Sequence, residues 1–132
     1  MSTKPYKPVG WFEIYVDDMV RAKAFYEATL DIKLESLPIP DGDGGLEMWM
    51  FPDGMDSSKP GCSGALCRME GCGAGGGGTL IYFSCEDCSV EAARAKENGG
   101  SIYKEKMSIG QYGFIAIVAD TEGNTIGLHS MK

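Results

Sequence analysis

One strand-to-helix pattern occurs twice in this chain, and it constrains the fold more than any other feature. The first copy is an apolar strand, Trp11–Val16, that passes through Asp17 and Asp18 into a helix beginning near Met19. The second copy is the strand Thr79–Cys85, followed by the acidic pair Glu86–Asp87 and another helix. Internal repetition of this kind indicates a repeated structural unit. We therefore expect two similar modules.

Turn residues and apolar runs predict the remaining elements of both modules. The first helix ends at Leu30, and Ala22, Phe25, Tyr26, Thr29 and Leu30 follow a helical period. Predicted strands follow at Ile32–Pro38, Leu46–Phe51 and Ser63–Met69, with a hairpin turn over residues 38–45. In the second module, a helix over Ser89–Asn98 precedes strands at Ser101–Lys106, Phe114–Ala119 and Thr125–Ser130.

These elements predict an α+β fold with βαβββ order in each module. The modules span about residues 10–70 and 79–130, joined by a flexible glycine-rich linker over residues 71–78. The linker is not a phosphate-binding loop, because no Gly-Lys-Ser or Gly-Lys-Thr opens a helix after it. With 132 residues, the chain is expected to be one domain spanning residues 1–132.

Composition argues against several classes of partner. The net charge is −7, and the twelve lysines and arginines form no basic stripe. Nucleic acids and anionic membrane surfaces both require cationic patches, so neither is an expected partner. No apolar run approaches the ~20 residues of a membrane span. The first residues lack the apolar stretch of a signal peptide, which favours a cytoplasmic location.

The five cysteines are expected to be structural thiols. Cys85 and Cys88 form a C-x-x-C pair, the spacing of a redox motif. The two acids between them would raise the pKa values of both thiols and so disfavour thiolate chemistry. Cys62, Cys67 and Cys72 have no histidine near them in sequence, so a zinc site is not expected there.

Two segments resemble the vicinal oxygen chelate superfamily, which includes glyoxalases, bleomycin-resistance proteins and extradiol dioxygenases. They are Phe12–Asp18 with Ala24–Glu27, and the turn and strand Asp120–Leu128. The small lactoylglutathione-lyase-related branch is the most similar. The resemblance implies a curved mixed sheet around a cup-shaped cavity that holds the ligand. It also leaves room for a homodimer, because dimers are common in this superfamily.

The resemblance places the family's metal-ligand positions at Trp11, Leu80 and Gly127, with a fourth within Ser63–Met69. An indole nitrogen has no free lone pair, leucine has no donor atom and glycine has no side chain. We therefore expect that the usual metal site is absent and that no cofactor is required.

Strand alternation then predicts which residues contact the ligand. Trp11, Glu13 and Tyr15 share one face of their strand, and Tyr82 and His129 share the parity of the metal positions on theirs. These five residues are the predicted ligand-binding set. The predicted function is bleomycin-resistance-like binding of a small, fairly apolar molecule.

Enzymatic alternatives stay open. In a lyase or isomerase, Glu13 or His129 would move a proton while Tyr82 orients the substrate. A displaced divalent-metal site could instead use Glu13, His129 and Cys67, although their spacing does not specify one. A third alternative is an accessory interaction protein with a filled, vestigial cavity.

Overall fold

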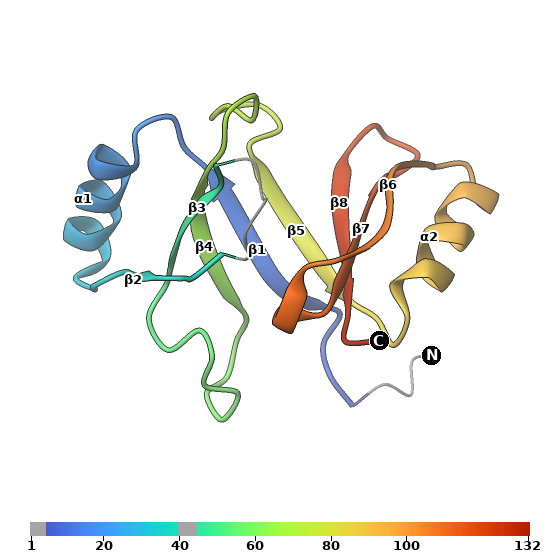
Figure 1. The fold of residues 1–132 in the computed structure, drawn as a ribbon, viewed down its shortest axis with the longest axis horizontal. Helices are drawn as coiled ribbons and strands as arrows, with labels where there is room; N and C mark the ends of the chain where they lie inside the picture. Colours follow the sequence, from blue (N-terminus) through green and yellow to red (C-terminus); the bar gives the residue numbers. More distant parts are fainter. Residues whose placement is uncertain (1–4, 40–44) are drawn as a thin grey trace. The chain divides into compact units, whose positions relative to one another are not determined.

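The computed structural model describes residues 5–39 and 45–132 and confirms the α+β class with two tandem βαβββ modules (Figure 1). The first half contains β1 (Val9–Tyr15), α1 (Met19–Leu30), β2 (Glu35–Ser36), β3 (Glu47–Met50) and β4 (Ser63–Arg68). The second half contains β5 (Thr79–Ser84), α2 (Cys88–Glu97), β6 (Ser101–Ser108), the short 3₁₀ helix η1 (Gly110–Tyr112), β7 (Phe114–Ala119) and β8 (Thr125–Ser130).

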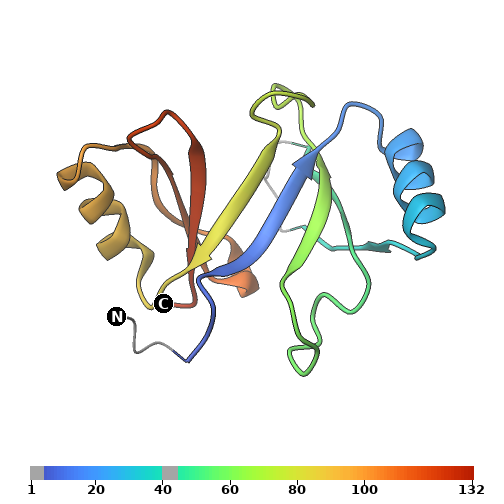
Figure 2. The ribbon, with the colours of Figure 1, turned by 180° about the vertical axis from the view of Figure 1, so that it is seen from behind.

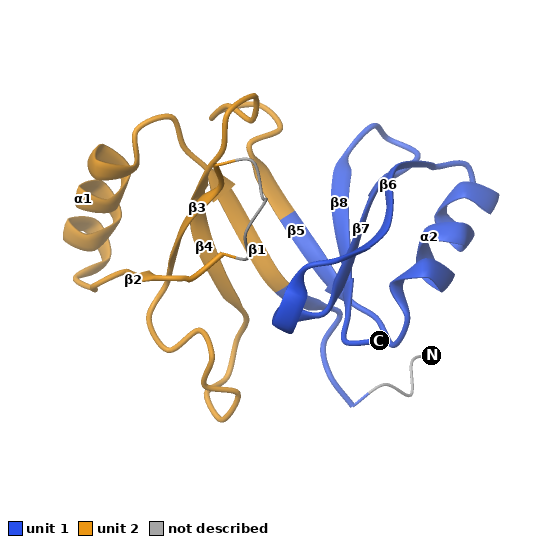
Figure 3. Ribbon diagram, viewed as in Figure 1, with its two compact units in different colours: residues 1–10, 81–132 blue, residues 11–80 orange. Residues whose placement is uncertain are grey.

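The chain divides into two compact units (Figure 3). One unit is residues 11–80, and the other combines residues 81–132 with the segment up to Gly10. The N-terminal segment joins the second unit through backbone pairing, since the Ser84 N–H donates to the Pro8 carbonyl at 2.8 Å. Gly10 also lies against the Ser84 side chain and leaves no space for a Cβ.

The sheet of the first unit has the strand order β2-β3-β4-β1. β1 and β4 run parallel and side by side (Figure 2), while β3 is antiparallel to both β4 and β2. The register pairs Glu13 with Ala65 and Tyr15 with Cys67. Residues paired across neighbouring strands point to the same face, so Glu13, Tyr15 and Cys67 project from one side of the sheet.

Helix α1 has the predicted bounds because both of its ends carry specific signals. The Asp18 carboxylate accepts the Arg21 N–H at 3.0 Å, which satisfies an orphan donor of the first turn. Asp31 ends the helix in the left-handed conformation (φ 55°), and its N–H bonds the Glu27 carbonyl. The helix buries Met19 against the Val16 and Leu66 cluster.

The predicted apolar stripe on α1 is partly wrong. Ala22 and Tyr26 pack against the core as expected, whereas Phe25 and Leu30 are 60% and 53% exposed. The buried face is centred on Met19, Ala22 and Tyr26, and the helix contributes little else to the core.

In the second unit, the strand order is β5-β8-β7-β6, and α2 covers one face of the sheet. Asp87 caps α2 by accepting the Ser89 N–H at 3.1 Å. Cys88 and Ala92 of the helix pack on Ala116, Val118 and Leu128 of the strands. The core position of Cys88, which is fully buried, fits a structural thiol better than an exposed redox motif.

Some strand bounds differ from the sequence prediction. β1 begins at Val9, earlier than Trp11, and β2 comprises only Glu35–Ser36 instead of Ile32–Pro38. β6 extends to Ser108, and register shifts flank Lys104 in its pairing with β7. Such irregularities change which side chains share a face, so simple alternation could not assign the faces of β6. Most of the predicted turn at 38–45 lies outside the described residues.

The glycine-rich segment 71–78 is attached to the first unit. The Tyr15 N–H donates to the Gly78 carbonyl at 2.7 Å, and the Ala74 N–H donates to Asp17 Oδ1 at 3.2 Å. No helix in the described part of the chain is long and apolar enough to cross a membrane.

Candidate functional site

The face of the first unit's sheet that α1 does not cover carries the predicted polar residues. Its side chains include Trp11, Tyr15, Met48, Ala65 and Cys67, which form one packed cluster with Leu37, Ile39 and Leu46. Helix α1 packs instead against the cluster built on Val16 and Leu66. The uncovered face is therefore aromatic and aliphatic, and Glu13 lies within it.

Glu13 is the central polar group of this face and is only 8% exposed. The Trp11 indole Nε1–H donates to Glu13 Oε2 at 3.1 Å, and the Tyr15 hydroxyl donates to Oε1 at 2.9 Å. Each carboxylate oxygen thus has its own donor, which fixes the plane of the group. The predicted sharing of one face by these three residues therefore produces a hydrogen-bonded triad.

The Cys67 thiol lies on the same face and has a pKa that is shifted by its surroundings. Burial, and then the charge of Glu13, raise the pKa of the Cys67 thiol well above its ordinary value. The thiol therefore stays protonated at neutral pH, which makes it a poor nucleophile and a poor metal ligand. The interaction between Cys67 and Glu13 depends on the parallel β1–β4 register, which cannot be read from the spacing of the two residues in the chain.

Tyr82 lies in the second unit, on the face that α2 leaves uncovered. It is 6% exposed and sits opposite Gly127 in the β5–β8 register. A Cβ added to Gly127 would overlap the Tyr82 ring. The ring therefore occupies the space that any larger residue at position 127 would need.

His129 is on β8, two residues after Gly127, and is half-buried. Its Nε2 lies 2.6 Å from the Tyr112 carbonyl oxygen. A carbonyl only accepts hydrogen bonds, so Nε2 carries the proton and donates it to Tyr112. Proton transfer by His129 would therefore have to use Nδ1. The structure brings Tyr82 and His129 to the same face of the second unit's sheet.

The positions that the resemblance assigns to the family's metal ligands fit a metal poorly. The Trp11 nitrogen donates to Glu13, Leu80 offers no donor atom, and the Tyr82 ring blocks a longer side chain at Gly127. Within the described ranges, no three His, Cys, Asp or Glu side chains gather in a way that could hold a metal ion.

A second indole–carboxylate pair lies on the face that α1 covers. The Trp49 Nε1–H donates to Glu47 Oε2 at 3.0 Å, in the same two-residue spacing as Trp11 and Glu13. The Lys23 ammonium of α1 sits 3.3 Å from the centre of the Trp49 ring. Sequence reasoning missed this arrangement, since it requires Lys23 of α1 to reach the Trp49 ring on β3.

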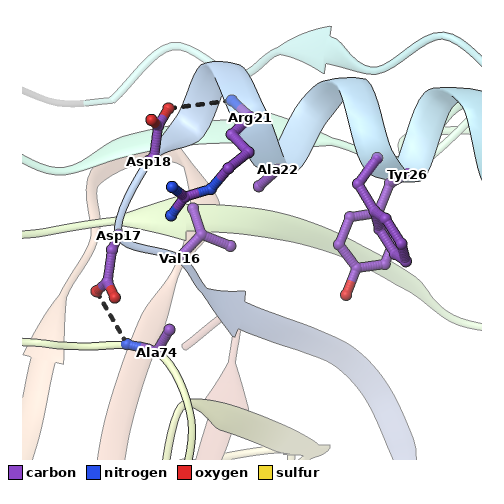
Figure 4. Close-up of a pocket in the computed structure, with 8 residues that line it drawn as sticks. Val16, Asp17, Asp18, Arg21, Ala22, Tyr26 and Ala74 are labelled. Carbon is purple, nitrogen blue, oxygen red and sulfur yellow. Dashed lines mark hydrogen bonds between the residues drawn. The ribbon is translucent and has the colours of Figure 1, made fainter.

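A cavity of about 340 Å³ opens between the start of α1 and the glycine-rich segment (Figure 4). Its acids already have structural roles: Asp17 holds the Ala74 N–H and Asp18 caps α1. The cavity was not predicted from sequence. It is lined by Val16, Asp17, Asp18, Arg21, Ala22, Phe25, Tyr26 and Ala74.

Comparison with known proteins gives one matching family description, the Glyoxalase/Bleomycin resistance protein/Dioxygenase superfamily, over residues 9–128. A curated relative, the anthracycline biosynthesis protein DauV of Streptomyces sp. (strain C5), is 30% identical over 103 residues, or 75% of this chain. The chain spans about a third of that relative's length (33%).

Solved structures share the fold at low sequence identity. Methylmalonyl-CoA epimerase from Mycobacterium tuberculosis aligns with a TM-score of 0.67 at 16% identity, covering 100% of this chain and 93% of the epimerase. A variant of the Streptomyces coelicolor methylmalonyl-CoA epimerase, in complex with 2-nitronate-propionyl-CoA, aligns with a TM-score of 0.63 at 18% identity, covering 94% and 96% of the two chains.

Proposed function

Because this chain belongs to the glyoxalase/bleomycin resistance protein/dioxygenase superfamily, we propose that it binds a small, fairly apolar molecule without the family's usual metal. The proposed contact surface is the uncovered face of the first unit, with Trp11, Glu13 and Tyr15 at its centre. Tyr82 and His129 form the corresponding surface of the second unit. The mode of action is sequestration, as in the bleomycin-resistance group.

The observation that carries this proposal is the Glu13 triad. A nearly buried carboxylate is costly unless it is hydrogen-bonded, and here Trp11 and Tyr15 each provide a donor. The surrounding side chains are apolar. An apolar surface with one oriented polar group is the usual composition of a small-molecule site.

The metal-free part of the proposal is supported by the donor set and by packing. Trp11 uses its nitrogen as a donor to Glu13, and Gly127 has no space for a carboxylate beside Tyr82. Metal-dependent isomerisation and ring opening need a Lewis acid, so these reactions are not proposed.

A fluorescence screen tests binding at this face. In the Trp49→Phe variant, Trp11 is the remaining tryptophan, and its emission reports directly on the Glu13 triad. We expect at least one apolar compound of a diverse library to change this emission saturably and to raise the melting temperature. The matched variant Trp11→Phe retains Trp49 and should lose the emission response.

The same screen separates binding from catalysis. A compound that binds is then incubated with the protein and followed by NMR for isomerisation or elimination. Turnover that is abolished by Glu13→Gln would favour the lyase or isomerase alternative over sequestration. Absence of any saturable response across the library would contradict the proposed function.

A further inference from the structure

We propose that the molecule bound at this face carries an organic ammonium group, which sits on the Trp11 and Tyr15 rings beside Glu13. This inference rests on the proposed function and specifies its ligand class. It is drawn from the triad's geometry and from a second arrangement of the same groups elsewhere in the first unit.

The first unit already contains an ammonium ion on an indole–carboxylate pair. The Lys23 ammonium lies 3.3 Å from the centre of the Trp49 ring, while the Trp49 Nε1–H donates to Glu47 at 3.0 Å. A cation is attracted by the negative face of an aromatic ring, most strongly by tryptophan. A carboxylate bound at the indole N–H adds negative charge at the ring edge and strengthens this attraction.

Trp11 and Glu13 reproduce that pair in a more buried setting. The Nε1–Oε2 distance is 3.1 Å, and Tyr15 adds a second ring whose hydroxyl holds the other carboxylate oxygen at 2.9 Å. Both donors are neutral groups, and together they orient the carboxylate. Glu13 is buried, whereas Glu47 is exposed, so water screens the charge of Glu13 less than that of Glu47.

The charge of Glu13 acts on the neighbouring Cys67 thiol. Burial, and after it the charge of Glu13, raises the pKa of the Cys67 thiol, so the Glu13 carboxylate opposes a second negative charge on this face. The Glu13 carboxylate would repel an anionic ligand in the same way and would attract a cationic one. The net charge of −7 also attracts cations at long range. Alkyl groups on the nitrogen suit the partly buried aliphatic residues of the same cluster, Leu37, Ile39 and Leu46.

The test compares three probes of nearly the same shape but different charge. They are choline, its neutral carbon isostere with tert-butyl in place of trimethylammonium, and the tert-butylacetate anion. None of them absorbs where tryptophan does. Each is titrated into the Trp49→Phe variant, in which Trp11 reports binding and the Lys23–Trp49 contact is removed.

We expect choline to bind at least about tenfold more tightly than its neutral isostere, with the anion weaker still. In Glu13→Gln, the amide oxygen can accept from Trp11 and the amide nitrogen can donate to Tyr15, so the triad keeps its shape without its charge. The choline preference should then fall to about threefold or less. Glu47→Gln is the matched control and should leave the preference unchanged.

Each outcome bears on the inference. A neutral isostere that binds as tightly as choline would overturn the ammonium assignment and leave the proposed function intact. A Trp11 response to apolar library compounds but not to choline would likewise overturn the ammonium assignment and leave the proposed function intact. If Glu13→Gln fails to fold, the three-probe comparison on Trp49→Phe decides alone. No Trp11 response to any library compound or probe would remove the proposed function as well.

Discussion

At the scale of single residues, the uncovered face of the first unit depends on hydrogen bonds that a sequence pattern does not contain. Alternation along β1 places Trp11, Glu13 and Tyr15 on one side. It does not show that both aromatic side chains donate to the carboxylate between them. The two donors explain why an acidic residue is tolerated at 8% exposure.

Removal of one donor should weaken the triad measurably. Tyr15→Phe deletes the hydroxyl that donates to Glu13 Oε1 and keeps the ring. We expect a loss of about 1 kcal/mol in the free energy of unfolding, measured by urea denaturation at neutral pH. Tyr103→Phe is the control, since Tyr103 is 66% exposed, and it should change stability little. Equal effects of the two variants would show that the Tyr15 bond contributes nothing.

Gly127 should be intolerant of even a methyl group. A Cβ there overlaps the Tyr82 ring, which is itself buried. We expect Gly127→Ala to destabilise the protein by about 1–3 kcal/mol through overpacking. Gly76→Ala provides the comparison, because a Cβ at Gly76 meets no atom within 4 Å. A thermal melt in which both variants match the parent protein would contradict the close Tyr82–Gly127 packing.

At the scale of elements, the bounds that sequence predicted correctly are those with chemical signals at the ends. Helix α1 begins after Asp18 and ends before Asp31, and both residues make capping contacts. β7 and β8 are equally well bounded, by Gly113 and by the turn at Asp120. The start of β1, both ends of β2 and the end of β6 lack such signals, and there the prediction is wrong.

The candidate site was predictable only in part, for a physical reason. Residues on one strand are related by local geometry, so the alignment of Trp11, Glu13 and Tyr15 follows from sequence. Contacts between strands depend on register. The influence of Glu13 on Cys67 and the packing of Tyr82 on Gly127 belong to this second kind. Family resemblance located position 127, but it did not reveal what fills the space.

The cap of α2 should make stability depend on pH in the acid range. Hydrogen bonds from Ser89 and then Lys106 lower the pKa of Asp87 to about 2. The unfolded value is about 3.9, so the charged cap stabilises the fold above that pH, and its contribution disappears as pH falls through about 2. In Asp87→Asn the cap remains but the ion pair with Lys106 is lost.

We therefore expect the melting temperature of Asp87→Asn to lie below that of the parent protein near neutral pH. The difference should shrink as the pH is lowered from about 4 towards 2, since the parent carboxylate then becomes neutral as well. The measurement is a series of thermal melts across this range. A difference that is unchanged at the lowest pH would show that the charge of Asp87 is not what stabilises α2.

At the scale of the whole molecule, the fold is that of the superfamily, whereas the side chains at the positions assigned to metal ligands lack donor atoms for a metal. Superfamily membership and the likeness to epimerase structures establish the βαβββ architecture. Architecture alone does not specify the reaction, which depends on the side chains placed upon it. The positions that the resemblance assigns to metal ligands lie in both units: Trp11 and Leu80 in the first, and Gly127 in the second.

The absence of donor atoms at these positions leads to a prediction about metal binding by the full chain. After growth with zinc, nickel, cobalt, manganese and iron, and after dialysis, we expect bound metal far below one equivalent by elemental analysis. A metal-dependent superfamily member, prepared in parallel, should retain about one equivalent. Retention of one equivalent by this chain would contradict metal-free binding.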